Sequence, residues 1–240
     1  MAAPGFAIEG RRVTLPVEVR DARCAFASFL VPADRVRALV PAGVDVAEAF
    51  PGRAIASLAG IEYRDNDLGA YNELAVAFLA RTGGGRALPL AGMALDLARG
   101  RLAAYIHRLP VTTAFSCAAG RDIWGFPKTV DDVRFADADG RRTSTWSIDG
   151  VRVLTLAVAR GGRLRYGDLR LDALGAVGGL RRTPFTSSGE GVGFRLGGAT
   201  LTLGSHPLAA ELATLGLPRR ALMSGWIERM RARFEAPVPA

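Results

Sequence analysis

The sequence predicts a mainly β domain of the α+β class: an antiparallel sheet that closes into a barrel, with a few short helices. Apolar or alternating runs bounded by turn residues recur along the 240 residues, as is typical of strands. Closing the sheet into a barrel would remove its exposed edges. We find neither a repeat of roughly 20–50 residues nor a linker-like segment, so we expect a single domain over residues 1–240.

The first half of the chain is expected to contain five strands and two short helical segments. The strands are predicted at Val13–Val19, Cys24–Val31, Ala54–Tyr63, Leu74–Ala80 and Ala103–Leu109. A short helix should begin at Pro32 and stop at Pro41, because proline suits the first helical turn and cannot continue a helix. One or two helical turns are expected over Thr113–Ala119, with Thr112 or Thr113 as the N-cap.

The second half begins as a meander. Strands are predicted at Val133–Ala136 and Arg142–Ile148, and Asp149-Gly150 suits a tight hairpin because both central residues of such a turn need positive φ. A helix starting at Ser205-His206-Pro207 should end near Gly216 and Pro218. Residues 222–234 fit both a helical face and alternate positions of a strand, so the pattern leaves their state open.

Cofactor, metal and nucleic-acid chemistry have little support, and we expect no cofactor. Gly83-Gly84-Gly85 is expected to be a loop and Gly161-Gly162 a turn, and neither follows the strand–GxGxxG–helix pattern of a dinucleotide site. The only histidines, His107 and His206, are far apart, and no CxxC pair is present. The net charge of +8 comes from arginines spread along the chain, which argues against nucleic-acid binding.

The compartment is predicted to be cytoplasmic. The N-terminal residues lack the pattern of a secretion signal, and no apolar run is long enough to cross a membrane. Cys24 and Cys117 lie in apolar sequence and are expected to be unpaired thiols in a reducing environment.

Lysine is nearly absent from this chain. Of 31 basic residues only Lys128 is a lysine, in a chain that uses arginine wherever a charge suffices. Arginine cannot replace the ε-amine as a nucleophile, because the guanidinium stays protonated. Trp124 and Phe126 precede Lys128, so we expect apolar surroundings that lower the pKa of the amine. These features predict a Schiff base; the alternative is a lysine that survived a codon bias and points into water.

A glutamate is the second candidate for chemistry. Glu73 lies at the mouth of the apolar run Leu74–Ala80, where a carboxylate can act as a general acid or base, or hold a charged nitrogen. The alternative is an exposed residue at a strand end.

These stretches resemble the acetoacetate decarboxylase family. The resemblance rests on Tyr71-Asn72-Glu73, on Tyr105-Ile106-His107, and above all on Gly120-Arg121 followed by Phe126-Pro127-Lys128, in the family's order and at similar spacings. It is tightest between about residues 68 and 130 and weak after residue 162. It implies a cone-like antiparallel barrel with an internal active site, assembled into a homo-oligomer.

The resemblance also implies roles for particular residues. Lys128 corresponds to the Schiff-base lysine and Glu73 to the active-site glutamate. Around them we expect Arg23, Tyr71, Trp124 and Phe126 to bind the substrate, with Arg23 near the family's carboxylate-binding arginine.

The chain departs from the family at three points. Thr129 stands where the decarboxylases carry a second lysine, and a second acidic position falls near Leu58. Glu62 is close to it in sequence but should point elsewhere, and Arg20 and Arg23 flank the place of the family's arginine without aligning cleanly. We therefore expect Schiff-base chemistry on a small keto acid or related carbonyl compound, with aldol, dehydration or cyclisation chemistry ahead of decarboxylation. A non-catalytic barrel that binds a hydrophobic ligand is the other alternative.

Overall fold

The structure, a computed structural model, describes residues 5–82, 96, 99–217 and 220–240, and strands dominate it. Its elements are β1 (Gly5–Ile8), β2 (Arg11–Thr14), β3 (Val17–Pro32), α1 (Ala33–Arg37), β4 (Asp45–Val46), β5 (Glu48–Phe50), β6 (Arg53–Asn66), β7 (Tyr71–Arg81), β8 (Leu102–Val111), α3 (Ala114–Trp124), β9 (Lys128–Val130), β10 (Asp132–Ala138), β11 (Arg141–Ile148), β12 (Val151–Ala159), β13 (Leu164–Gly175), β14 (Arg181–Leu196), β15 (Ala199–Leu203), α4 (Pro207–Thr214), β16 (Met223–Phe234) and β17 (Val238–Pro239). The prediction of a mainly β fold is confirmed. The expected loop at Gly83-Gly84-Gly85 and the helix-ending Pro218 lie outside the described residues.

The larger sheet closes into a ring. Its strands follow the order β7–β6–β3–β16–β14–β13–β8, and β8 also pairs with β7. Neighbouring strands of the ring are antiparallel except β8 and β13, and the short strand β9 joins β8 in parallel. A second, antiparallel sheet has the order β10–β11–β12–β15. The ring agrees with the expected barrel, and its two parallel pairings are a feature that the sequence did not indicate.

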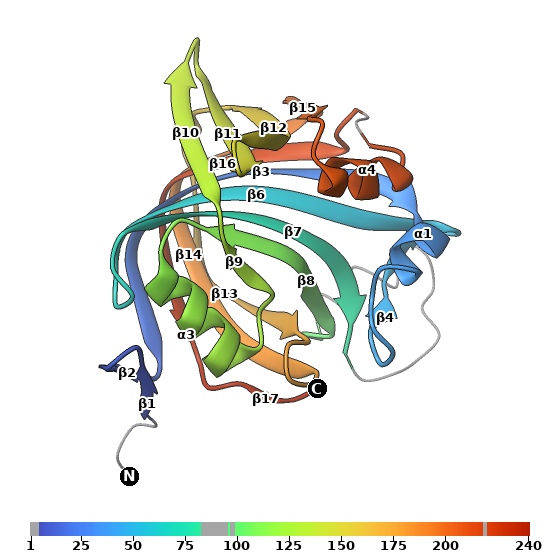
Figure 1. Ribbon diagram of the computed structural model, residues 1–240. Helices are drawn as coiled ribbons and strands as arrows, with labels where there is room; N and C mark the ends of the chain where they lie inside the picture. The colour runs from blue at the N-terminus through green and yellow to red at the C-terminus, as the bar shows by residue number, and fades with distance from the viewer. Residues whose placement is uncertain (1–4, 83–95, 97–98, 218–219) are drawn as a thin grey trace.

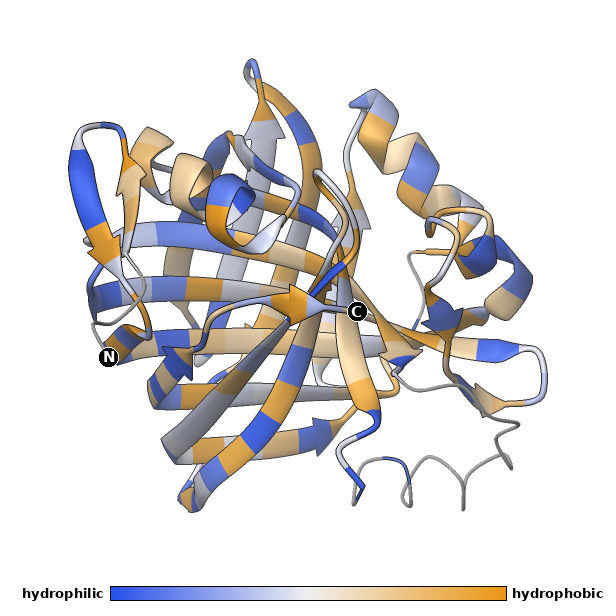
Figure 2. Ribbon diagram, turned by 90° about the horizontal axis from the view of Figure 1, so that it is seen from below, coloured by the Kyte–Doolittle hydropathy of each residue, from blue (hydrophilic) through white to orange (hydrophobic). Residues whose placement is uncertain are grey.

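The two larger apolar cores lie on opposite faces of the ring's strands. The second sheet and α4 lie on one side of β3 and β6, and α3 lies on the other, within the curve of the ring (Figure 1). Trp146, Trp226 and Phe78 belong to the core on the first side, whereas Trp124 and Phe126 belong to the core beside α3. Hydrophobic and hydrophilic residues alternate along many strands (Figure 2), as expected when the two faces of a sheet have different surroundings.

The N-terminal strands differ from the prediction. The expected strand Val13–Val19 is interrupted, because Pro16 has no N–H to donate, and β3 then runs without a break from Val17 to Pro32. Its register against β6 shifts between Val19 and Asp21 and again between Asp21 and Ala22. Such bulges change which residues point to each face of a sheet.

Most other elements lie where the pattern placed them. Asp149 and Gly150 both have positive φ, as the predicted hairpin requires, and Thr113 caps α3 by accepting a hydrogen bond from the Ser116 N–H. The helix predicted to start at Ser205-His206-Pro207 is α4. Residues 222–234, which fitted both a helix and a strand, form the strand β16 from Met223 onward. None of the helices within the described ranges is long and apolar enough to cross a membrane.

Candidate active site

A small cavity inside the ring brings the predicted catalytic residues together. It has a volume of about 40 Å³, and Lys128, Glu73, Tyr71 and Tyr63 supply most of its polar groups. Valine, leucine and aromatic side chains make up the remaining walls, apart from Asn66. The site is therefore a group of ionisable side chains in largely apolar surroundings.

Strand periodicity and register place three of these residues on one face. Tyr71 and Glu73 are two residues apart on β7, so both side chains point into the ring. On the neighbouring strand β6, Tyr63 lies directly opposite Tyr71, and the two rings stack with their centroids 4.5 Å apart. The hairpin between β6 and β7 thus presents two phenols and a carboxylate to the same cavity.

Lys128 reaches this cavity because α3 ends sharply. Gly125 adopts a left-handed conformation (φ 69°) after the last helical turn, and the backbone N–H groups of Gly125 and Phe126 close that turn. The chain then enters β9, which begins at Lys128 and pairs with β8. Within α3, Gly120 packs against the stem of the lysine: a Cβ atom at position 120 would lie 2.4 Å from Lys128 Cδ. The stem therefore has little freedom.

Lys128 and Glu73 form a buried ion pair. Nζ of Lys128 lies 2.8 Å from Oε2 of Glu73, and the two side chains are 4% and 6% exposed. Nζ also donates a 3.4 Å hydrogen bond to the Tyr71 hydroxyl. Burial alone would lower the pKa of Lys128, but the Glu73 carboxylate and the Tyr71 oxygen raise it above its ordinary value. The expectation of a lowered pKa was therefore wrong, because the carboxylate outweighs the apolar walls.

The two tyrosines differ in their partners. The Tyr63 hydroxyl donates to Oε1 of Glu73 over 3.2 Å, so the two carboxylate oxygens have separate donors. Burial, followed by the Glu73 charge, raises the pKa of Tyr63 well above 10. Burial also raises the pKa of Tyr71 to about 12 although Lys128 opposes it, so both phenols keep their protons at neutral pH. Tyr63 was missed from the sequence, where only its position opposite Tyr71 in a hairpin could have indicated it.

Trp124 and Phe126 form part of the cavity wall. Their rings stack with centroids 6.0 Å apart, and the Trp124 indole N–H donates to the carbonyl oxygen of Glu235. Because that N–H is engaged, Trp124 offers the cavity an apolar surface rather than a donor. Both residues lie where the expectation of a substrate-contacting role requires them.

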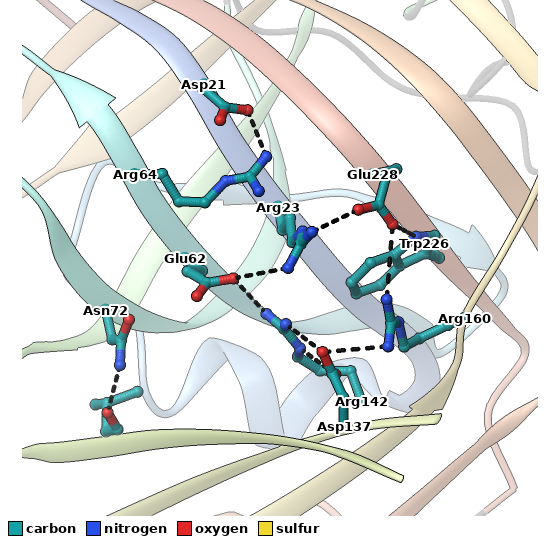
Figure 3. Close-up of polar contacts among 11 residues, drawn as sticks. Asp21, Arg23, Glu62, Arg64, Asn72, Asp137, Arg142, Arg160, Trp226 and Glu228 are labelled. Carbon is teal, nitrogen blue, oxygen red and sulfur yellow. Dashed lines mark hydrogen bonds and ion pairs between the residues drawn. The ribbon is translucent and has the colours of Figure 1, made fainter. Parts of the chain in front are cut away.

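Arg23 lies elsewhere. Its guanidinium contacts Glu228 at 2.8 Å and Glu62 at 3.9 Å, in a network that also includes Arg142 (Figure 3), and it is not among the residues lining the cavity. The bulges in β3 explain this difference: Val19 faces the cavity, and an unbroken alternation would have placed Arg23 on that face as well. The geometry gives no support for Arg23 as the ligand of a substrate carboxylate.

The other departures from the family pattern also have physical explanations. Leu58 is buried in the core between the sheets, and Glu62 pairs with Arg142, so Glu62 points away from the cavity as expected. Thr129 follows Lys128 on β9, is exposed, and donates to Asp131. Neighbouring residues of a strand point to opposite faces, so the side chain at position 129 points away from Lys128. A lysine at this position would therefore have little influence on the pKa of the Lys128 amine.

Metal binding finds no support in the described part of the chain, where no group of three or more histidine, cysteine, aspartate or glutamate side chains could hold an ion. Cys24 and Cys117 are free thiols.

Comparison with known proteins identifies related folds. The sequence pattern that defines the acetoacetate decarboxylase family matches residues 7–233. No curated protein matches the chain in sequence. Acetoacetate decarboxylase from Legionella pneumophila is structurally similar, with a TM-score of 0.67 at 15% identity over 99% of this chain and 91% of that one. The enduracididine biosynthesis enzyme MppR, in complex with pyruvate, has a TM-score of 0.66 at 15% identity over 99% and 98% of the two chains. An acetoacetate decarboxylase-like enzyme from Sphingomonas wittichii RW1 has a TM-score of 0.58 at 17% identity over 95% of each chain.

Proposed function

The chain belongs to the acetoacetate decarboxylase family, and on that premise we propose that it is a Schiff-base enzyme acting through Lys128 on a small keto acid or related carbonyl compound. One observation carries the proposal: the only lysine of the chain is buried in a cavity, with its amine 2.8 Å from a carboxylate. A buried charged pair inside a largely apolar cavity is costly to maintain, and ionisable groups with perturbed pKa values cluster at functional sites.

The first chemical step is removal of a proton from Lys128. The resting ammonium is not a nucleophile, and Oε2 of Glu73 is the acceptor within hydrogen-bond reach. The neutral amine then adds to the carbonyl carbon of the substrate. Glu73 then returns its proton to the hydroxyl of the carbinolamine, which leaves as water, and the products are an iminium on Nζ and a Glu73 carboxylate.

Tyr71 is placed to assist this addition. Its hydroxyl accepts a hydrogen bond from Nζ at 3.4 Å, and its own proton is held tightly. A carbonyl carbon close to Nζ would bring its oxygen near the Tyr71 hydroxyl, which can donate to the oxygen as negative charge develops there. We assign Tyr71 the role of donor to the substrate oxygen and Trp124 and Phe126 the role of apolar walls.

The iminium can support two reactions. Loss of a proton from the carbon next to it forms an enamine, and Glu73 is placed to move that proton, which favours aldol, dehydration or cyclisation chemistry. Decarboxylation is the second candidate, because largely apolar walls would destabilise a carboxylate next to the iminium. The MppR structures with pyruvate, and with a condensation product of pyruvate and imidazole 4-carboxaldehyde, concern a related fold and are consistent with the first candidate. We further expect a cytoplasmic homo-oligomer that needs no cofactor.

Exchange of hydrogen at the carbon next to the carbonyl tests the proposal. Pyruvate, acetoacetate and longer keto acids are incubated with the enzyme in deuterated buffer and followed by proton NMR, and CO2 release is measured in parallel. Exchange without CO2 release is expected for the condensation chemistry, and CO2 release from a β-keto acid for the decarboxylase. Lys128→Arg is the control. If neither signal exceeds that control with any compound, the proposal fails and a non-catalytic binding barrel is favoured.

A further inference from the structure

Tyr63 is a polar group of the cavity that contacts Glu73, and the proposed reaction assigns it no role. Its side chain is buried, it lines the cavity, and its hydroxyl donates a hydrogen bond to Oε1 of Glu73. Glu73 has Lys128 on its other oxygen, so the carboxylate lies between two donors on different strands.

The contact restricts how Glu73 can turn. The last torsion of a glutamate is broad, so a carboxylate that only the lysine contacted could present either oxygen to the cavity. Hydrogen bonds to both oxygens fix the plane of the group. Tyr63 is itself held, because its ring stacks on that of Tyr71 at 4.5 Å and its backbone lies opposite Tyr71 in the β6–β7 ladder.

The same contact selects the oxygen that carries a proton. In the structure the Tyr63 hydroxyl donates to Oε1, and a protonated Glu73 that keeps this contact leaves Oε1 as the acceptor. In the acid form Oε1 is then the carbonyl oxygen and the proton is carried by Oε2, the oxygen that faces the reacting amine.

We propose that Tyr63 is a positioning residue that keeps the exchangeable proton of Glu73 on Oε2 and so directs proton transfer to one face of the enamine. This inference rests on the proposed function. In the forward direction Oε2 removes a proton from the carbon next to the iminium, and in the reverse direction it returns one to the same face of that carbon. No other reactant is needed, and the electron pair of the broken C–H bond passes to the enamine.

The number of deuterium atoms incorporated into 2-oxobutyrate tests this proposal. Its C3 carries two hydrogens on opposite faces, so exchange that is confined to one face stops after one deuterium, whereas exchange at both faces continues to two. Mass spectrometry of the recovered acid distinguishes the two outcomes, and the buffer-catalysed rate is subtracted. The wild-type enzyme is expected to stop at one deuterium.

Tyr63→Phe removes the hydroxyl and keeps the ring that stacks on Tyr71. We expect exchange about tenfold slower, with a substrate concentration for half-maximal rate that is unchanged within about twofold, and accumulation of the dideuterated acid. Tyr166→Phe is the matched control, because it removes a tyrosine hydroxyl that hydrogen-bonds to Ser187 away from the cavity, and this variant should still stop at one deuterium. Tyr63→Met is a second variant without the hydroxyl, with the same expected outcome.

The outcomes separate this inference from the proposed function. If Tyr63→Phe and Tyr63→Met still stop at one deuterium, or if wild type already incorporates two, the role of Tyr63 is refuted while the Schiff-base function stands. If wild type exchanges no deuterium into any keto acid, the proposed function fails and this inference fails with it.

Discussion

Replacing Glu73 by glutamine removes the charge that holds Lys128 in its protonated form. The amide would keep the size and shape of the side chain but could not balance an ammonium 2.8 Å away. Burial would then be the dominant influence on the amine, and burial lowers the pKa of lysine. We therefore expect Glu73→Gln to shift the pKa of Lys128 from above the ordinary lysine value to below it.

The magnitude follows from the separation of the charges. Two unit charges 2.8 Å apart interact with about 6 kcal/mol at an effective dielectric constant of about 20. Experiments that remove one partner of a buried pair give about 3–5 kcal/mol, because the surroundings relax. At about 1.4 kcal/mol per pKa unit, the expected fall is roughly 2–4 units.

Reductive methylation with formaldehyde and cyanoborohydride measures this change. Formaldehyde is small and reacts only with the free amine, and the N-terminal amine of the same molecule is the internal reference. At pH 8 the ratio of Lys128 to N-terminal methylation should rise at least about tenfold in Glu73→Gln. The matched control Glu190→Gln removes a carboxylate that pairs with Arg229 on the surface, and it should leave the ratio unchanged. An unchanged ratio in Glu73→Gln would refute the conclusion that Glu73 sets the protonation of Lys128. Independently of this ratio, the turnover of Glu73→Gln should fall about a hundredfold or more, because the group that carries the proton is lost.

Three further predictions concern other parts of the fold. Gly120→Ala places a Cβ against the buried stem of Lys128, so borohydride trapping of a keto acid should slow at least about tenfold in a folded protein; unchanged trapping would mean that the stem moves freely. Arg23→Met should leave the trapping rate within about twofold of wild type and lower the free energy of unfolding by about 1–2 kcal/mol, whereas a large loss of substrate affinity would return Arg23 to the site. Burial lowers the pKa of His107 although Glu211 opposes it, so the unfolded chain binds more protons near pH 6.5 and stability is lost as the pH falls below that value. The melting temperature should therefore fall more between pH 7.5 and 5.5 in wild type than in His107→Gln, and equal falls would contradict this account.

Local pattern was sufficient for most strands and for singling out the two ionisable residues, Lys128 and Glu73, that meet in the cavity. Lys128 could be singled out because lysine is otherwise absent, and Glu73 because it precedes an apolar run. The charge state of Lys128 could not be predicted, since it depends on a 2.8 Å contact between β7 and β9. Tyr63 was missed for the same reason, because its place in the cavity depends on the register of β6 against β7.

The misplacement of Arg23 shows a different limit. Alternation along a strand predicts a face only when the strand is regular, and β3 contains register shifts beside Asp21. The polar residues around the shifts also resemble a turn, which is why one continuous strand was expected to be two. Bulges depend on the partner strands, so a single sequence does not reveal them.

Formation of an imine on Lys128 is the central claim, and borohydride trapping tests it most directly. The enzyme is incubated with a keto acid, reduced, and its intact mass is measured before the adduct is mapped by peptide. We predict a gain equal to the mass of the keto acid less one oxygen atom, located on Lys128 and absent from Lys128→Arg. Absence of any adduct with the whole set of keto acids, or an adduct confined to the N-terminal amine, would contradict the account.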